Sequence, residues 1–372
     1  MNVCTVWPGE EFVQSKLDGW IAGLLPTYNS AVNTGVKRRA AALLEVLGVY
    51  LAGALLNARI VAFVTHHQLI SPQNPFALLT VHASNADLLV ASRQLALALF
   101  FIYFSFFIII VPLDRWRGRR GPATYGLTRA GISVKALVAT GVAAAALSEW
   151  PVLIHSLVDA VHPLGAMAPW RQAFFDMSWR RWQFWLFAGI LSYAVVPVVE
   201  ELLFRGFYQR RLAEDWGDGP AILAVACLFT LSHKQYLIAN LYNVTMIVSL
   251  FCVAIGLGVV FAWTRSLIPG MIAHAIIDIP MTLAWQAALL AVFAIVIFFA
   301  WRGGLAAVRQ VFGRLEMLAT LTLIVLFGVF ALGVGSLPAK ALSAVGMLIV
   351  AIGMDVAIRG RTISGKAASA GS

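Results

Sequence analysis

Residues 244–263 read VTMIVSLFCVAIGLGVVFAW and carry no charged side chain. A transmembrane helix needs about 20 consecutive, mostly apolar residues, so this stretch predicts a helix that spans a membrane. The whole chain of 372 residues agrees, because 60% of its residues are hydrophobic and only 12% are charged. Soluble domains average about 45–50% apolar residues and about 25% charged residues. The composition therefore excludes a soluble enzyme, a disordered protein and a secreted disulfide scaffold.

Other apolar stretches of similar length recur along the chain. They predict an all-α fold, a polytopic transmembrane helical bundle of about 8–10 spans. Breaks at charged and turn-forming residues place ten candidate spans, at residues 40–63, 88–112, 134–160, 183–206, 219–238, 244–263, 267–283, 285–301, 316–336 and 339–357. Residues 9–25 have apolar side chains at helical spacing and precede Pro26, which predicts an amphipathic helix on the membrane surface.

This pattern divides the chain into four predicted regions. Residues 1–36 form an N-terminal segment with the interfacial helix, and residues 37–182 hold the N-terminal transmembrane helices. Residues 183–290 form a helical core that contains the polar residues discussed below. Residues 291–372 hold the C-terminal transmembrane helices and a cytoplasmic tail.

The formal net charge of +10 comes from basic residues that cluster between the apolar stretches. Cytoplasmic loops are enriched in Lys and Arg, so these clusters indicate orientation and not nucleic-acid binding. With ten spans, the clusters at 37–39, 115–129, 210–211, 265, 302–314 and 359–366 all lie on one side. We therefore expect an integral, multi-pass membrane protein with both termini in the cytoplasm. Arg171, Arg180 and Arg181 are the exception, because their loop falls on the opposite side.

Ionisable side chains inside apolar stretches are the best guide to function, because each costs about 2.5–3.5 kcal/mol at the centre of a membrane helix. Three neighbouring stretches carry such residues in close sequence. They are Val198-Val199-Glu200-Glu201-Leu202-Leu203-Phe204-Arg205-Gly206-Phe207, Phe229-Thr230-Leu231-Ser232-His233 and His274-Ala275-Ile276-Ile277-Asp278. These three stretches together hold two glutamates, two histidines, an arginine and an aspartate. So many costly side chains in three apolar helices are expected only if they face one another.

The spacing of these residues supports convergence. Glu201 and Arg205 are four residues apart on one helix face and can form an ion pair. His274 and Asp278 have the same spacing. Glu200 lies about 100° around the helix from Glu201, so the two glutamates are expected to have different roles.

This residue set fits peptide-bond hydrolysis, which requires an activated water, a stabilised oxyanion and a protonated leaving amine. Glu200 is a suitable general base. In one version His233, His274 and Asp278 bind Zn²⁺, because two histidines and one carboxylate are a known catalytic ligand set. In a metal-free version Glu200 and His233 activate the water, and His274 with Asp278 orients or stabilises the oxyanion. The alternative is a purely structural network, for which Glu201 and Arg205 are the strongest candidates.

The three motifs resemble, in order and spacing, those of the CAAX protease and bacteriocin-processing family, which includes Abi proteins and CAAX prenyl endopeptidases. The motifs are Glu-Glu-x-x-x-Arg at 200–205, Phe-x-x-x-His at 229–233 and His-x-x-x-Asp at 274–278. The resemblance covers about residues 183–290. CAAX endopeptidases usually have Asn where this chain has Asp278, which weakens a specific assignment to prenyl-protein processing.

The resemblance implies an α-helical intramembrane endopeptidase with a site open toward the cytoplasm. Its substrates would be membrane-embedded or lipid-anchored proteins or peptides, of the CAAX, bacteriocin or sorting-signal type. By the same resemblance, Glu200 corresponds to the catalytic glutamate, with Glu201 and Arg205 as its motif partners. His233 corresponds to the second motif, and His274 with Asp278 to the third. The family has been described both as metalloproteases and as glutamic proteases, so the resemblance leaves Zn²⁺ open.

Two other classes of function compete with this reading. One is a non-catalytic immunity or binding protein of the membrane that retains the fold. The other is a proton-coupled transporter, in which the carboxylates would form a relay, although the inverted halves typical of transporters are not evident. No motif indicates an organic cofactor or a nucleic-acid partner.

Overall fold

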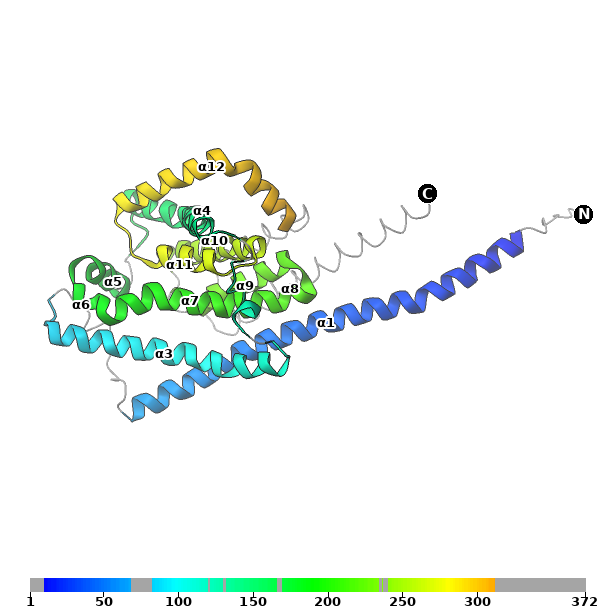
Figure 1. Cartoon of the computed structure of the whole chain (residues 1–372), viewed down its shortest axis with the longest axis horizontal. Coiled ribbons are helices and arrows are strands. Elements are labelled where there is room, and N and C mark those ends of the chain that lie inside the picture. Colours follow the sequence, from blue (N-terminus) through cyan, green and yellow to red (C-terminus); the bar gives the residue numbers. More distant parts are fainter. Residues whose placement is uncertain are drawn as a thin grey trace, which may run out of the picture.

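The computed structural model describes residues 10–67, 82–119, 121–129, 132–165, 169–233, 236 and 240–311. All regular elements in these residues are helices, which confirms the predicted all-α class (Figure 1). The α-helices are α1 (Glu10–His66), α3 (Asn85–Trp116), α4 (Val134–Val161), α5 (Pro169–Arg180), α6 (Trp182–Phe184), α7 (Val196–Glu201), α8 (Arg210–Trp216), α9 (Asp218–Ser232), α10 (Leu241–Thr264), α11 (Ile268–Asp278) and α12 (Leu283–Val311). The remaining elements are a 3-10 turn, η1 (Pro122–Tyr125), and three π-helical segments, η2 (Trp185–Gly189), η3 (Leu191–Val195) and η4 (Leu202–Gln209).

Within the described residues, four helices are long and apolar enough to cross a membrane, namely Arg38–His66 within α1 and the whole of α3, α4 and α10. A fifth candidate consists of Trp182–Gly189 and Leu191–Trp216, which are bent by 46° relative to each other. These residues agree with the first four predicted spans and with the sixth. The chain is therefore a multi-pass integral membrane protein.

The fifth and seventh predicted spans are shorter in the structure than a full membrane crossing, because α9 has 15 residues and α11 has 11. The eighth predicted span lies within α12, which has 29 residues. The ninth and tenth predicted spans lie outside the described residues. The predicted surface helix at residues 9–25 is helical from residue 10 and forms the first part of α1. Its position on the membrane surface stays a prediction.

Polar N-caps begin three of the spanning helices. The side chains of Ser84, Ser133 and Asn240 accept hydrogen bonds from backbone amides in the first turns of α3, α4 and α10. Each cap satisfies an N–H group that has no partner within its helix, and such caps typically contribute about 1 kcal/mol. The caps therefore fix where these helices start, outside the apolar stretch itself.

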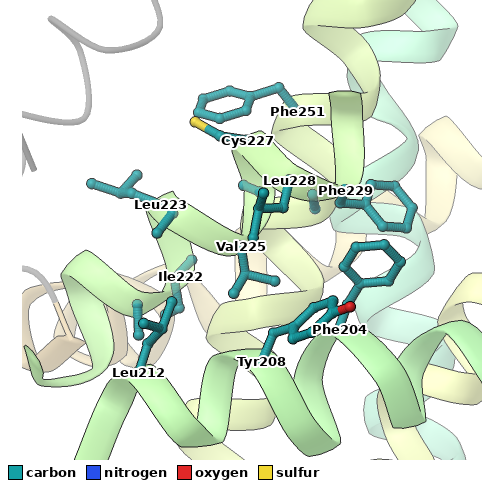
Figure 2. Packing of buried hydrophobic residues seen from close by; sticks show 14 of the residues in the cluster. Phe204, Tyr208, Leu212, Ile222, Leu223, Val225, Cys227, Leu228, Phe229 and Phe251 are labelled. Atoms are coloured by element: carbon teal, nitrogen blue, oxygen red, sulfur yellow. The ribbon is translucent and has the colours of Figure 1, made fainter. Parts of the chain in front are cut away.

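Helix α9 lies at the centre of the main hydrophobic core. All its side chains from Gly219 to Thr230 are buried, as expected for a helix that is apolar on every face. Figure 2 shows Phe204 and Tyr208 packing against the α9 residues Val225 and Phe229, while Cys227 faces Phe251 on the other side. This packing fixes the end of α9, where His233 follows.

The bundle has two ends with different chemistry. At the end that contains α8, which we call the α8 end, ion pairs join α1, α3 and α8. Arg211 binds Glu45 (2.7 Å) and Asp215 (2.8 Å), and Arg117 also pairs with Glu45. Arg265 binds Asp218 at 2.7 Å, so the start of α9 and the end of α10 lie there too.

At the opposite end, which we call the α5 end, α5 lies beside α6 (Figure 1). The indole of Trp179 donates to the Pro280 carbonyl (2.6 Å), which ties α5 to the end of α11. Arg181 donates to the Ala83 carbonyl before α3. Gln286 of α12 donates to Ser156 of α4 (3.2 Å), which places the end of α4 and the start of α12 here as well.

Candidate functional site

Glu200 and Glu201 occupy the short α-helical turn α7, between the π-helical segments η3 and η4. The two side chains point to different surroundings, as their spacing predicts. Glu201 is fully buried, whereas the Glu200 side chain is 12% exposed. The buried glutamate thus belongs to the packing between helices, and the other reaches a cavity.

Glu201 is the centre of a buried polar network. Its Oε1 accepts from Nη1 of Arg205 (2.8 Å) and from Nδ1 of His274 (2.9 Å). Arg205 also donates to the Ala254 carbonyl of α10 (3.0 Å), and its guanidinium lies over the ring of Phe229 at 5.0 Å. This network joins α7, α9, α10 and α11 and fixes the orientation of the His274 ring.

Gly270 gives Glu201 the room to approach α11. A Cβ at position 270 would lie 3.0 Å from Oε2 of Glu201 and 3.6 Å from its Cδ. A side chain there would push the carboxylate away from the His274 ring one turn further along α11. The glycine is therefore required by the close contact between the two helices, and the three motifs do not include it.

Glu200 contacts two groups from other helices. Its Oε1 accepts a hydrogen bond from the hydroxyl of Tyr103 in α3. Its Oε2 lies 3.7 Å from Nε2 of His274, which is close but longer than a hydrogen bond. Oδ1 of Asp278 lies at a similar distance from the same nitrogen, 3.6 Å. The Nε2 of His274 is thus close to two carboxylates while its Nδ1 is held by Glu201.

His233 is placed by the C-terminal cap of α9. Its Nδ1 lies 2.8 Å from the Phe229 carbonyl, which can only accept a hydrogen bond, so Nδ1 carries the hydrogen. In the neutral ring Nε2 is then the acceptor nitrogen. The His233 ring also packs against Phe229, with centroids 4.7 Å apart.

Four of the six predicted residues line one cavity of about 590 Å³, namely Glu200, His233, His274 and Asp278. Glu201 and Arg205 do not line it. A second cavity of about 260 Å³ lies between α1 and α3 and shares Leu99, Tyr103, Glu200 and His233 with the first. The glutamate, the tyrosine and one histidine therefore stand where the two cavities meet.

Tyr103 was not among the sequence-predicted site residues. It lies 97 positions before Glu200, in an apolar helix, and its hydroxyl donates a hydrogen bond to Glu200. An aromatic residue in a transmembrane stretch has no spacing that would relate it to a motif so far away. Only the packing of α3 against the core could reveal it.

No group of three His, Cys, Asp or Glu side chains in the described part of the chain is arranged to hold a metal ion. The Nδ1 atoms of His233 and His274 bond to a carbonyl and a carboxylate, respectively. The proposed set of His233, His274 and Asp278 as Zn²⁺ ligands therefore stays a prediction, and no chemical step below uses a metal.

The comparisons with known proteins identify the stretch that carries this site. Residues 182–280 match the family model described as type II CAAX prenyl endopeptidase Rce1-like. This range includes every residue of the three motifs and excludes Tyr103. No curated protein and no solved structure matches the chain.

Proposed function

Because residues 182–280 belong to the Rce1-like family of type II CAAX prenyl endopeptidases, we propose that the chain hydrolyses a peptide bond by a water molecule that Glu200 activates. The substrate would be a membrane-embedded or lipid-anchored protein or peptide. The observation that carries the proposal is the position of Glu200, on the wall of the large cavity and next to His274 and Tyr103.

In the proposed reaction the Glu200 carboxylate takes one proton from a water molecule, and the water oxygen attacks the carbonyl carbon of the substrate. The resulting tetrahedral intermediate carries its negative charge on the former carbonyl oxygen. When the carbon–nitrogen bond breaks, Glu200 returns the proton to the leaving amine. The products are a new carboxylic acid and a new amine; the proton of the acid then passes to the amine to give a carboxylate and an ammonium group, so atoms and charges balance.

The histidines have separate proposed roles. The acceptor Nε2 of His233 orients the attacking water through its hydrogen, since Nδ1 is occupied by the Phe229 carbonyl. His274, with Nδ1 held by Glu201, donates from Nε2 to the oxyanion, which requires its protonated form. Asp278 lies 3.6 Å from that nitrogen and supports the charge.

Glu201 and Arg205 are proposed to act through His274 and not on the substrate. Both are completely buried, and neither lines the cavity. Burying this ion pair removes both charges from water, which costs free energy. The hydrogen bonds of Glu201 with His274 and of Arg205 with the Ala254 carbonyl offset that cost. They are therefore positioning residues in this proposal.

The experiment compares the N- and C-termini of membrane proteins in cells that express the wild type, Glu200→Gln or Glu214→Gln at matched levels. Glu214→Gln is the control, because it makes the same chemical change at the α8 end, where Glu214 pairs with Arg119. We expect defined termini to be lost with Glu200→Gln alone. If the folded Glu200→Gln protein leaves all termini in place, the site is not proteolytic, and a non-catalytic binding or immunity function becomes the better explanation.

A further inference from the structure

The second cavity, between α1 and α3, is built largely from residues outside the stretch 182–280 that matches the family model. Helix α1 contributes Tyr50, Ala54 and Asn57, which are spaced i, i+4 and i+7 and therefore share one helix face. The facing side of α3 contributes four residues, also at helical spacing: Leu99, Ile102, Tyr103 and Phe106. Helix α1 thus forms one wall of a cavity that Glu200 and His233 line from the side of the site.

A close helix contact lies beside this cavity. A Cβ at position 53 of α1 would lie 2.3 Å from Cδ1 of Phe106, so only glycine fits there. The ring of Tyr50 packs in the same region, with its centroid 6.5 Å from those of Phe106 and Tyr208. This contact holds α1 against α3 and fixes where Asn57, about one turn beyond Gly53, stands relative to the site.

Asn57 is a polar residue within an apolar spanning helix. It lies in the candidate span Arg38–His66, 12 residues or about 18 Å beyond Glu45 of the α8 end. Its side chain is half-buried, and its Oδ1 is buried without a hydrogen-bond partner among the described residues. A buried acceptor without a partner costs free energy, so its presence at a cavity wall calls for a molecule that uses it.

A peptide group matches the chemistry of this amide. The Asn57 side chain offers one acceptor and one donor, and rotation about its Cβ–Cγ bond turns either of them toward the cavity. An extended substrate backbone carries N–H and C=O groups that need partners in an apolar environment. Two other polar groups of the wall are already engaged, since Tyr103 donates to Glu200 and Ser232 donates to the Phe229 carbonyl.

The position of Glu200 relates this amide to the reaction. Glu200 lines both cavities, so a peptide whose scissile bond lies beside this carboxylate would extend into the large cavity on one side and into the second cavity on the other. We propose that the second cavity binds the substrate backbone on one side of the scissile bond, and that Asn57 binds a peptide group there by a hydrogen bond. This assignment rests on the proposed function.

Four single variants of the full chain test the assignment. Asn57→Leu removes the amide at similar volume, whereas Asn57→Gln keeps an amide. Ala54→Leu reduces the cavity without touching Glu200, and Ala52→Leu makes the same change at an exposed position of α1 as its control. We measure kcat and KM in lipid vesicles with a synthetic peptide that spans a cleavage site found by the comparison of termini. The thermal midpoint is measured without peptide.

For Asn57→Leu we expect kcat/KM to fall by about 2- to 10-fold, mainly through KM, because a hydrogen bond to the substrate is lost away from the reacting atoms. The thermal midpoint should stay the same or rise, because an amide oxygen without a protein partner is removed. Asn57→Gln should recover part of the loss. Ala54→Leu should raise KM, and Ala52→Leu should leave it unchanged.

A wild-type KM in the folded Asn57→Leu protein would overturn the role of Asn57, and so would a loss of activity that accompanies a lower thermal midpoint. A wild-type KM in the folded Ala54→Leu protein would overturn the second cavity as a binding site. If Glu200→Gln leaves all termini in place, the proposed function fails and this assignment falls with it. If Glu200→Gln removes termini and Asn57→Leu has no effect, the assignment alone is wrong.

Discussion

Tyr103→Phe tests the geometry of the site apart from the family motifs, because Tyr103 lies in α3 and outside residues 182–280. The change keeps the ring and removes only the hydroxyl that donates to Oε1 of Glu200. Hydrogen bonds to charged groups typically contribute about 1.5–3 kcal/mol. Because 1.36 kcal/mol corresponds to a factor of ten in rate, loss of this positioning should lower kcat by about 10- to 150-fold.

The assay measures kcat and KM of purified protein in lipid vesicles, with a substrate found by the comparison of termini. Tyr103 contacts the proposed base, so we expect KM to change much less than kcat. Tyr125→Phe is the matched control, because Tyr125 lies in η1 and lines neither cavity. A well-folded Tyr103→Phe protein with the kcat of the wild type would refute the placement of Tyr103 as a partner of the catalytic base.

Three further outcomes follow from the buried network and the proposed chemistry. Gly270→Ala places a Cβ 3.0 Å from Oε2 of Glu201, so both activity and the thermal midpoint should fall, by about 1–3 kcal/mol in stability. Gly48→Ala, with no atom within 4 Å in the middle of α1, should leave activity unchanged and keep or raise the thermal midpoint, because Ala favours a helix over Gly by about 0.5–1 kcal/mol. Arg205→Leu leaves the Glu201 carboxylate buried without its cation and should destabilise by about 3–5 kcal/mol in detergent unfolding, whereas Arg265→Leu, at an exposed ion pair, should cost under about 1 kcal/mol. Equal losses for the two arginine variants would contradict the buried-pair argument. Chelation of divalent metals should leave cleavage unchanged, and activity that is lost on chelation and restored by Zn²⁺ would favour the metal-dependent version instead.

Part of the site could be predicted from the sequence, because two of its residue pairs lie within one helical turn of each other along the chain. The four-residue spacing fixes Glu201 beside Arg205 and His274 within reach of Asp278, whatever the rest of the fold does. The cost of ionisable groups in apolar helices then makes contact between the motifs the natural expectation. The catalytic roles of these residues stay predictions.

The rest of the site depends on packing between distant segments, which spacing alone does not encode. Tyr103 and Gly270 acquire meaning only because α3 and α11 lie against α7. Glu45 had no charged neighbour along α1, yet it pairs with Arg117 and Arg211 across three helices. Helix lengths were overestimated for α9 and α11 because hydropathy continues past the residues where these helices end at the site.

The π-helical segments on both sides of α7 affect how this region can change during evolution. A π turn contains one residue more than an α-helical turn, so η3 and η4 each shift the register of the residues that follow. Deleting one residue from η3 would let that turn close as a regular α-helical turn and would leave Glu200 facing Tyr103, whereas the same deletion in a purely α-helical stretch would rotate the following residues by about 100°. The π turns are therefore the places in this helix where the length of the chain can change by one residue without turning Glu200 away from Tyr103.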